Sequence, residues 1–147
     1  MKAKRAVVDT NVLISAALLG GSLPARLLSL VLQRGCLLFS KSTFAELETR
    51  LWRPKFDRYL SIEMRKLLLH DLSAAAQWVA LADLAPFAAQ RYSRDANDDP
   101  FVHLALAGGA ECLISGDQDL LVLETVQGVP VLSPALALAA VENWSER

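Results

Sequence analysis

The stretch AVVDTNVLIS, residues 6–15, decides the fold. Its apolar, β-branched start runs into three polar side chains, those of Asp9, Thr10 and Asn11. A carboxylate inside an apolar run costs free energy unless it is hydrogen-bonded, ion-paired or bound to a metal. A buried strand over residues 6–8 that ends at a functional edge accounts for this pattern. The sequence therefore predicts that Asp9 is held at the end of a strand to do chemistry.

Strand and helix signals alternate along the rest of the 147 residues. The helix predicted over Leu23–Arg34 begins at the cap residue Ser22 and ends at Gly35. Such alternation is typical of a single α/β domain with an open, largely parallel sheet, and ligands of these sheets bind outside the carboxyl ends of the strands. Further strands are predicted over residues 36–39, 112–115 and Val129–Leu132, further helices over 42–52, 61–80, 100–108 and from Pro134 onward, and a polar loop over 90–100.

Composition narrows the class of protein. Charged residues, Gly or Pro interrupt every apolar run well before the roughly 18 residues that a membrane-spanning helix needs. Basic residues open the chain as in a signal peptide, but Asp9 and Asn11 fall inside the would-be apolar core, so we expect a cytoplasmic protein. Cys36 and Cys112 form no CxxC pair, which predicts neither a disulfide framework nor a zinc site; both are expected to be buried apolar residues.

Charge is segregated along the chain, although the net charge is only −1. Residues 50–66 contain six Lys or Arg and two acids, whereas residues 95–119 contain six acids and no Lys or Arg. Two solvated faces are the simplest interpretation. The alternative is an acidic site with a basic rim that contacts phosphate, because phosphate backbones bind Lys and Arg.

Acidic residues recur where strand ends and helix starts would meet. Each has a structural alternative, since Glu46 stands at capping-box spacing after Thr43. In the same way, Asp99 precedes Pro100 as an N-cap would, and Asp117 suits a turn. The full set of these acids is Asp9, Glu46, Asp98, Asp99, Asp117 and Asp119.

Gathered carboxylates imply a bound cation. They repel one another and raise each other's pKa unless a positive charge neutralises them. Oxygen ligands without His or Cys suit Mg²⁺ or Mn²⁺, and such ions activate water for phosphodiester cleavage. Thr10, Asn11 and Ser115 would then orient the ligands or the attacking water through hydrogen bonds.

Three segments together resemble a known family. VVDTNVLIS, TFAELETRL with its central Glu46, and DDPFVHLALAGGAECLISGDQDLL resemble the PIN-domain nucleases, particularly the VapC-like toxins of prokaryotic toxin–antitoxin pairs. The resemblance spans about residues 6–132. It implies a three-layer α/β/α sandwich around a largely parallel sheet, endoribonuclease activity dependent on Mg²⁺ or Mn²⁺, and a cognate antitoxin as partner.

The resemblance also implies roles for individual acids. Asp9 is the first metal ligand, supported by Asn11, and Glu46 is the second. Asp99 is favoured as the third because Val102, His103 and Leu106 continue its helical face, with Asp98 as an undecided neighbour. The fourth ligand is Asp117, with Asp119 close behind; SGDQDL departs from the T-R-N/D-x-x-D-F of many VapC-like chains and lacks their Arg, which leaves open which Asp is the primary ligand.

The remaining roles concern partners. A nuclease with an acidic centre needs cations at its rim, which favours Arg50, Arg53, Lys55 and Arg58 as RNA-backbone contacts. Apolar residues outside the core pattern allow a homodimer or higher oligomer. Two alternatives stay open: a catalytically silent PIN-like module that binds RNA or protein, and another Mg²⁺-dependent phosphohydrolase. A phosphohydrolase of the haloacid-dehalogenase type would need an acid where Asn11 stands.

Overall fold

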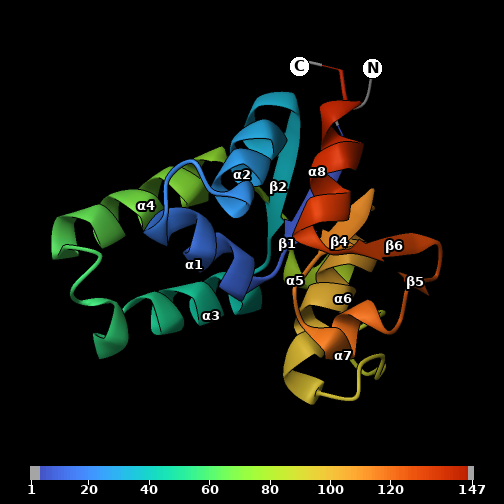
Figure 1. The fold of residues 1–147 in the computed structure, drawn as a ribbon. Coiled ribbons are helices and arrows are strands. Elements are labelled where there is room, and N and C mark those ends of the chain that lie inside the picture. Colours follow the sequence, from blue (N-terminus) through green and yellow to red (C-terminus); the bar gives the residue numbers. More distant parts are fainter. Residues whose placement is uncertain (1–3, 146–147) are drawn as a thin grey trace.

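The computed structural model describes residues 4–145 and contains a six-stranded sheet with the order β3-β2-β1-β4-β6-β5 (Figure 1). Every neighbouring pair is parallel except β5 with β6, which is antiparallel. The two inner strands β1 and β4 are aligned so that Val8 pairs with Ile114. The strands are β1 (Lys4–Val8), β2 (Gly35–Phe39), β3 (Gln77–Trp78), β4 (Cys112–Ile114), β5 (Thr125–Val126) and β6 (Val129–Leu132).

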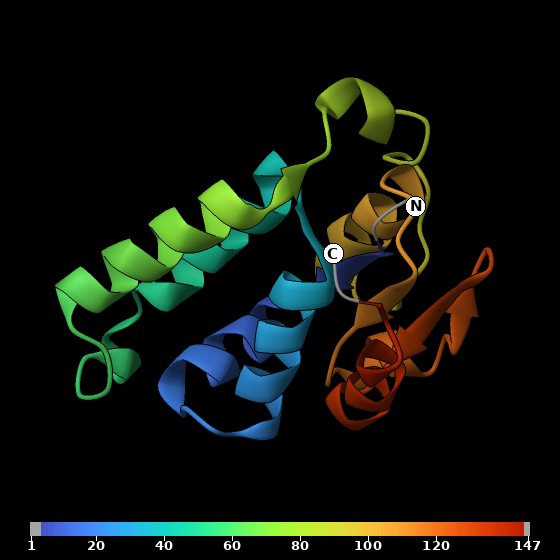
Figure 2. The ribbon, with the colours of Figure 1, turned by 90° about the horizontal axis from the view of Figure 1, so that it is seen from above.

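Helices cover both faces of the sheet, and this confirms the three-layer α/β/α sandwich. α1, α2, α3, α4 and α8 lie on one side, and α5, α6 and α7 on the other (Figures 1 and 2). α3 and α4 project from the sheet as an arm, which Figure 2 shows most clearly. The helices are α1 (Thr10–Leu18), α2 (Leu23–Arg34), α3 (Lys41–Leu51), α4 (Ile62–Ala75), α5 (Leu81–Leu84), α6 (Asp99–Ala107), α7 (Gln118–Leu121) and α8 (Pro134–Glu142), with 3₁₀ turns η1 (Pro54–Phe56) and η2 (Ala96–Asp98).

Burial on both faces explains the apolar run that becomes β1. Ala6 and Val8 face the core beneath α2, whereas Val7 faces the core beneath α6, and all three are at most 3% exposed. A side chain of valine size contributes about 1.5–3 kcal/mol when it is fully buried. A strand packed on both faces has a continuous apolar sequence, so the chain turns polar only where β1 ends at Asp9.

The predicted strands and helices are present, but one predicted helix is too long, and α1 and the short elements α5, α7 and β5 were not predicted. α2 and β6 have the predicted bounds. The helix predicted over residues 61–80 is wrong at its end, because α4 stops at Ala75 and Gln77–Trp78 pair with β2. The Trp78 ring lies 5.7 Å from that of Phe39 and 5.2 Å from that of Phe44, so aromatic packing favours an extended chain there. Helix α1, which begins at Thr10, was not predicted.

The cysteines and the helix lengths complete the description of the fold. Cys112 is buried, and burial raises the pKa of its thiol to about 12, in keeping with an apolar packing role; Cys36 is only partly buried.

Across residues 4–145 no single helix has both the length and the apolar character to cross a membrane. α1 and α2 reach that threshold only together, and they are bent by 108° at their junction.

Candidate active site

Asp9 is fixed at the point where β1 turns into α1. Its backbone N–H donates to the carbonyl oxygen of Ile114 at 2.9 Å, which continues the pairing of β1 with β4. Its side chain is buried and accepts a 2.7 Å hydrogen bond from the Ser115 hydroxyl. Burial raises the pKa of the Asp9 carboxyl, the bond from Ser115 opposes that rise, and the charge of Glu46 adds to it. A carboxylate that is costly to ionise in place would gain from a bound cation.

The Ser115 hydroxyl joins the ends of β1 and β4. It donates to Asp9 and accepts a 2.9 Å hydrogen bond from the backbone N–H of Asp117. Asp117 in turn caps α7, because its carboxylate accepts from the N–H of Asp119 at 2.9 Å. The turn predicted around Asp117 is therefore present, and it ties the backbone of this residue to Asp9 through Ser115.

Glu46 reaches the same place from α3. The capping box of α3 is formed by Ser40 and Thr43, so the alternative that Glu46 caps this helix from Thr43 is wrong. The Glu46 carboxylate is left to accept a 2.7 Å hydrogen bond from the buried Thr10 hydroxyl. Thr10, which directly follows Asp9 at the end of β1, thus orients the acid of α3 beside Asp9.

Arg50 belongs to this acidic group as well. Its guanidinium lies 3.0 Å from the Glu46 carboxylate and donates to the side-chain oxygen of Asn11 at 3.0 Å. Because Arg50 follows Glu46 by four residues, both point to the same side of α3. The positive charge of Arg50 lowers the pKa of Asp9. Arg50 is therefore engaged with the acids, whereas the sequence predicts it among RNA contacts.

The neighbours Asp98 and Asp99 lie in different surroundings. Asp99 accepts hydrogen bonds from the N–H groups of Tyr92 and Ser93 at 3.1 and 2.8 Å, and it pairs with Arg91 at 2.8 Å. Its carboxylate therefore fixes the loop before α6. Asp98 faces the acids instead: burial and the carboxylate of Asp117 raise its pKa to about 7, with smaller contributions from Asp95 and Asp9.

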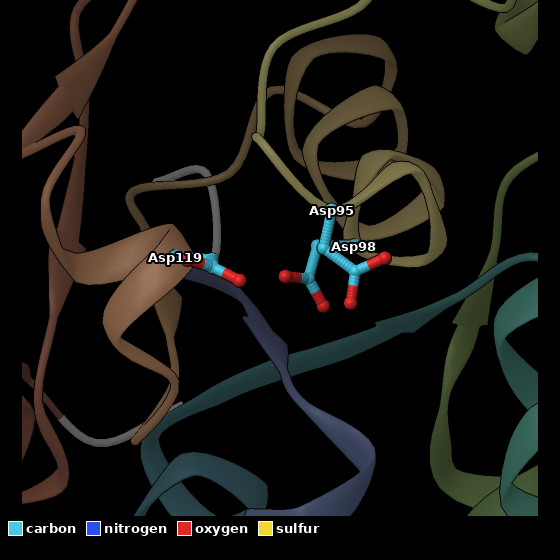
Figure 3. A group of neighbouring side chains, drawn as sticks. All are labelled: Asp95, Asp98 and Asp119. Atoms are coloured by element: carbon cyan, nitrogen blue, oxygen red, sulfur yellow. The ribbon is translucent and has the colours of Figure 1, made fainter.

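Asp95, Asp98 and Asp119 form a carboxylate cluster whose closest oxygens all lie within 4.8 Å of one another. Figure 3 shows Asp119 pointing across from α7 toward Asp95 and Asp98 at the start of α6. Arg94, which is well exposed, pairs with Asp119 at 2.8 Å. Asp95 was not singled out from the sequence, although its spacing of three residues from Asp98 was a usable signal. The two exposed arginines of this loop, Arg91 and Arg94, also escaped notice.

These acids form a connected group rather than separate surface charges. Glu46 contacts Thr10 beside Asp9, Asp9 connects through Ser115 to Asp117, and Asp117 faces Asp98. The donors are oxygens only, which is the set that Mg²⁺ or Mn²⁺ prefers. Burial and neighbouring carboxylates raise the pKa values of Asp9 and Asp98, and a divalent cation would offset both effects, so the residues present fit such an ion.

The other predicted RNA contacts lie away from the acids. Arg53, Lys55 and Arg58 are exposed around η1, at the end of the arm where α3 meets α4 (Figure 1). Arg65, counted in the same basic segment, is only 3% exposed; it pairs with Asp57 at 3.0 Å and stacks over the Trp52 ring. The basic segment therefore divides into an exposed group and a structural arginine.

Sequence and structure comparisons relate this chain to known proteins. A relative that is 30% identical over 120 residues, covering 81% of this chain and 74% of its own, is the uncharacterized protein MJ1680 of Methanocaldococcus jannaschii. VapBC2 from Rickettsia felis, solved bound to a DNA fragment from its promoter, has a similar structure, with a TM-score of 0.61, 13% identity, and coverage of 88% of this chain and 98% of that one. PAE2754 from Pyrobaculum aerophilum also has a TM-score of 0.61, with 18% identity and coverage of 95% and 96%. Residues 5–119 match the sequence model of the PIN domain, so this chain belongs to the PIN domain family, whose members are nucleases.

Proposed function

We propose that this protein is a metal-dependent endoribonuclease and the VapC-like toxin of a toxin–antitoxin pair, acting in the cytoplasm as a single domain. Membership of the PIN domain family supports cleavage of nucleic acid. The observation that carries the proposal is the junction of β1 and β4, where Ser115 ties the Asp9 carboxylate to the Asp117 backbone and the charges of Asp117 and Asp9 both act on Asp98. A fold that only packed its core would gain nothing from bringing repelling acids together there.

The metal-holding roles follow from where the carboxylates point. Asp99, which the sequence predicts as the third ligand, already serves the loop of residues 91–93. We assign that place to Asp98, which faces Asp117. Asp119 and Asp95 stand beside Asp98 and complete the oxygen set. The proposed ligands are Asp9, Glu46, Asp98 and Asp117, with Asp119 and Asp95 as further members.

The contribution of the chain is to hold these oxygens in position. When bound, Mg²⁺ or Mn²⁺ would activate water and stabilise the leaving oxygen of the phosphodiester. Thr10 orients Glu46, and Ser115 orients Asp9, through hydrogen bonds that exist before an ion binds. Asn11 takes part indirectly, because it accepts from Arg50 and so limits where that guanidinium can lie. Fixed ligands lower the reorganisation needed for catalysis.

Two groups of cations are placed to attract RNA. Arg91 and Arg94 border the acids, with side chains 63% and 69% exposed. Arg53, Lys55 and Arg58 form the second group at the end of the arm. A strand of RNA running from the arm to the acids would meet both groups, which supports the predicted basic rim.

The partner is proposed to be an antitoxin protein. Support comes from the similarity to VapBC2 and from exposed apolar side chains on the arm, where Tyr59, Ile62, Met64 and Leu67 are each more than half exposed. Exposed apolar groups of this kind mark protein interaction surfaces. The arm also suits a homodimer contact. Outside the arm, Leu19 after α1 is also 66% exposed.

The experiment that tests the function is cleavage of a mixed RNA pool by purified protein with Mg²⁺, with Mn²⁺ and with chelator. We expect metal-dependent cleavage that Asp9→Asn reduces to background. Asp83→Asn, which removes an exposed acid of α5, is the matched control and should cut like the parent. Cleavage that survives in Asp9→Asn would contradict the assignment of the site.

A silent binding module is the alternative function. It predicts RNA binding with the same affinity in chelator as in Mg²⁺, and no cleavage under any condition. Retention of the connected acids argues against it, because RNA phosphates are repelled by uncompensated carboxylates. Filter binding in chelator and in Mg²⁺ separates the two functions.

A further inference from the structure

A small hollow adjoins the acids on the side of α3. It measures about 190 Å³, and its walls come from the start of α3 and from η2 with the start of α6. Each wall carries one acid of the proposed site, Glu46 on α3 and Asp98 directly after Asn97. A nucleic acid whose phosphate lies at those acids would therefore extend into the hollow. Its lining is Ser42, Thr43, Glu46, Ala96, Asn97, Pro100 and Phe101.

Apart from Glu46, the side chains that line the hollow are uncharged. This neutrality determines which chemical group the hollow can bind. Among the residues that the structure describes, no Lys or Arg lines the hollow, and the nearby Arg50 is already paired with Glu46, so the lining offers a phosphate group no free cation. Phe101 is only 3% exposed, so the apolar surface comes chiefly from the partly buried Pro100, whereas Ser42 and Asn97 are exposed and offer hydrogen-bonding groups at the edge. Proteins recognise unpaired bases through hydrogen bonds to the base edges. The volume is below the roughly 300–1,000 Å³ of pockets for drug-sized ligands, which suits a single base.

Both walls are held rigid by hydrogen bonds. The η2 turn is capped by Asp95, whose carboxylate accepts from the N–H of Asn97 at 3.0 Å. The start of α3 is held by the Ser40–Thr43 capping box. Within residues 4–145 the side-chain amide of Asn97 and the hydroxyl of Ser42 make no hydrogen bond, and both side chains are exposed. Free polar groups on a fixed backbone are suited to selecting a ligand.

We infer that this hollow is a base-recognition subsite, which takes the unpaired base of a nucleotide next to the scissile phosphate and reads its edge with Asn97 and Ser42. The inference rests on the proposed function, because the acids are what place the phosphate. A carboxamide offers one donor and one acceptor side by side and bonds a base edge through both. The subsite thus assigns cleavage selectivity to residues that hold no metal.

The first test is sequencing of RNA ends after cleavage of a randomised pool by the parent, Asn97→Ala and Ser42→Ala. The parent should show a base preference at one position flanking the cut. Asn97→Ala should reduce that preference by about tenfold, in line with the loss of a two-bond base contact. Gln33→Ala, which removes an exposed amide on α2, is the control and should keep the parental preference.

The outcomes separate the subsite from the nuclease function. Cleavage by the parent with no base preference, or with a preference that Asn97→Ala retains, overturns the subsite and leaves the nuclease standing. If the parent does not cut, the proposed function fails, and binding decides about the hollow. In that case the four nucleoside 5′-monophosphates are titrated with Mg²⁺ while the side-chain amide signals are followed by NMR. A base-dependent shift of the Asn97 amide supports the subsite, and unchanged signals, or equal shifts with all four bases and with ribose 5-phosphate, overturn it.

Discussion

Replacing Asp98 by Asn should stabilise the metal-free protein at pH 8. Burial and the carboxylate of Asp117 raise the pKa of Asp98 from 3.8 to about 7. At about 1.36 kcal/mol per pKa unit, ionising Asp98 costs the folded state at most about 4 kcal/mol relative to the unfolded chain. Asp98 shares the repulsion with Asp117, so about half of this, roughly 2 kcal/mol, is the expected gain. For a chain of this length the midpoint of thermal unfolding should rise by about 4–8 °C.

The same pKa fixes how the gain depends on pH. The folded state binds the Asp98 proton more tightly than the unfolded chain does, because its pKa is the higher of the two. The contribution of Asp98 to stability is therefore complete below pH 3.8 and is lost as the pH rises through about 7. The amide that Asp98→Asn introduces does not titrate, so the variant should exceed the parent by less at pH 5 than at pH 8.

Thermal unfolding followed by tryptophan fluorescence in chelator, at pH 5 and at pH 8, measures both effects. Asp83→Asn serves as the control, because Asp83 is an exposed acid on α5 outside the acidic group. A midpoint for Asp98→Asn that is equal to or below that of the parent at pH 8 would refute the reasoning. A gain of the same size at both pH values would refute the assignment to Asp98 ionisation and point to better packing of the amide.

Three further predictions concern metal, positioning and RNA. Adding Mg²⁺ at 100 times its dissociation constant should stabilise the parent by about 2.7 kcal/mol in the same unfolding assay, and Asp98→Asn should lose most of that increase. Thr10→Val, which removes the donor to Glu46 from a fully buried position, should reduce the cleavage rate by about tenfold; a rate equal to that of the parent would show that Glu46 does not need Thr10. Substituting Arg53, Lys55 and Arg58 together by Ala should lower the slope of log affinity against log salt for single-stranded RNA by about 2, since each phosphate contact contributes about 0.7. An unchanged slope places the RNA elsewhere.

The sequence predicts most of the framework because β1 and α2 carry strong local signals. Residues 6–8 are apolar on both faces, and Ser22 with Gly35 delimits α2. The end of α4 was missed because its continuation is apolar and suits a helix; only the packing of Trp78 on β2 decides otherwise. Such a contact between distant segments leaves no mark in local periodicity.

The choice between Asp98 and Asp99 shows where sequence reasoning ends at the site. Neighbouring residues of a helix point about 100° apart, so one of the two faces the acids and the other faces away. Helical periodicity favours Asp99, but the loop of residues 91–93 folds back and takes up its carboxylate. The position of that loop is a tertiary property. Asp9, by contrast, could be recognised because a charge that interrupts a buried strand is conspicuous in any context.

The Ser115 hydroxyl has one hydrogen, and its donation to Asp9 gives the bridge a polarity. The backbone N–H of Asp117 points to Ser115, and Ser115 points to Asp9, so both dipoles run toward the same carboxylate. A carboxylate accepts this hydrogen bond more strongly than a neutral carboxyl group does, so the bond from Ser115 lowers the pKa of Asp9. The bridge thus favours one charge state of Asp9, and it makes the backbone after β4 sensitive to events at the end of β1.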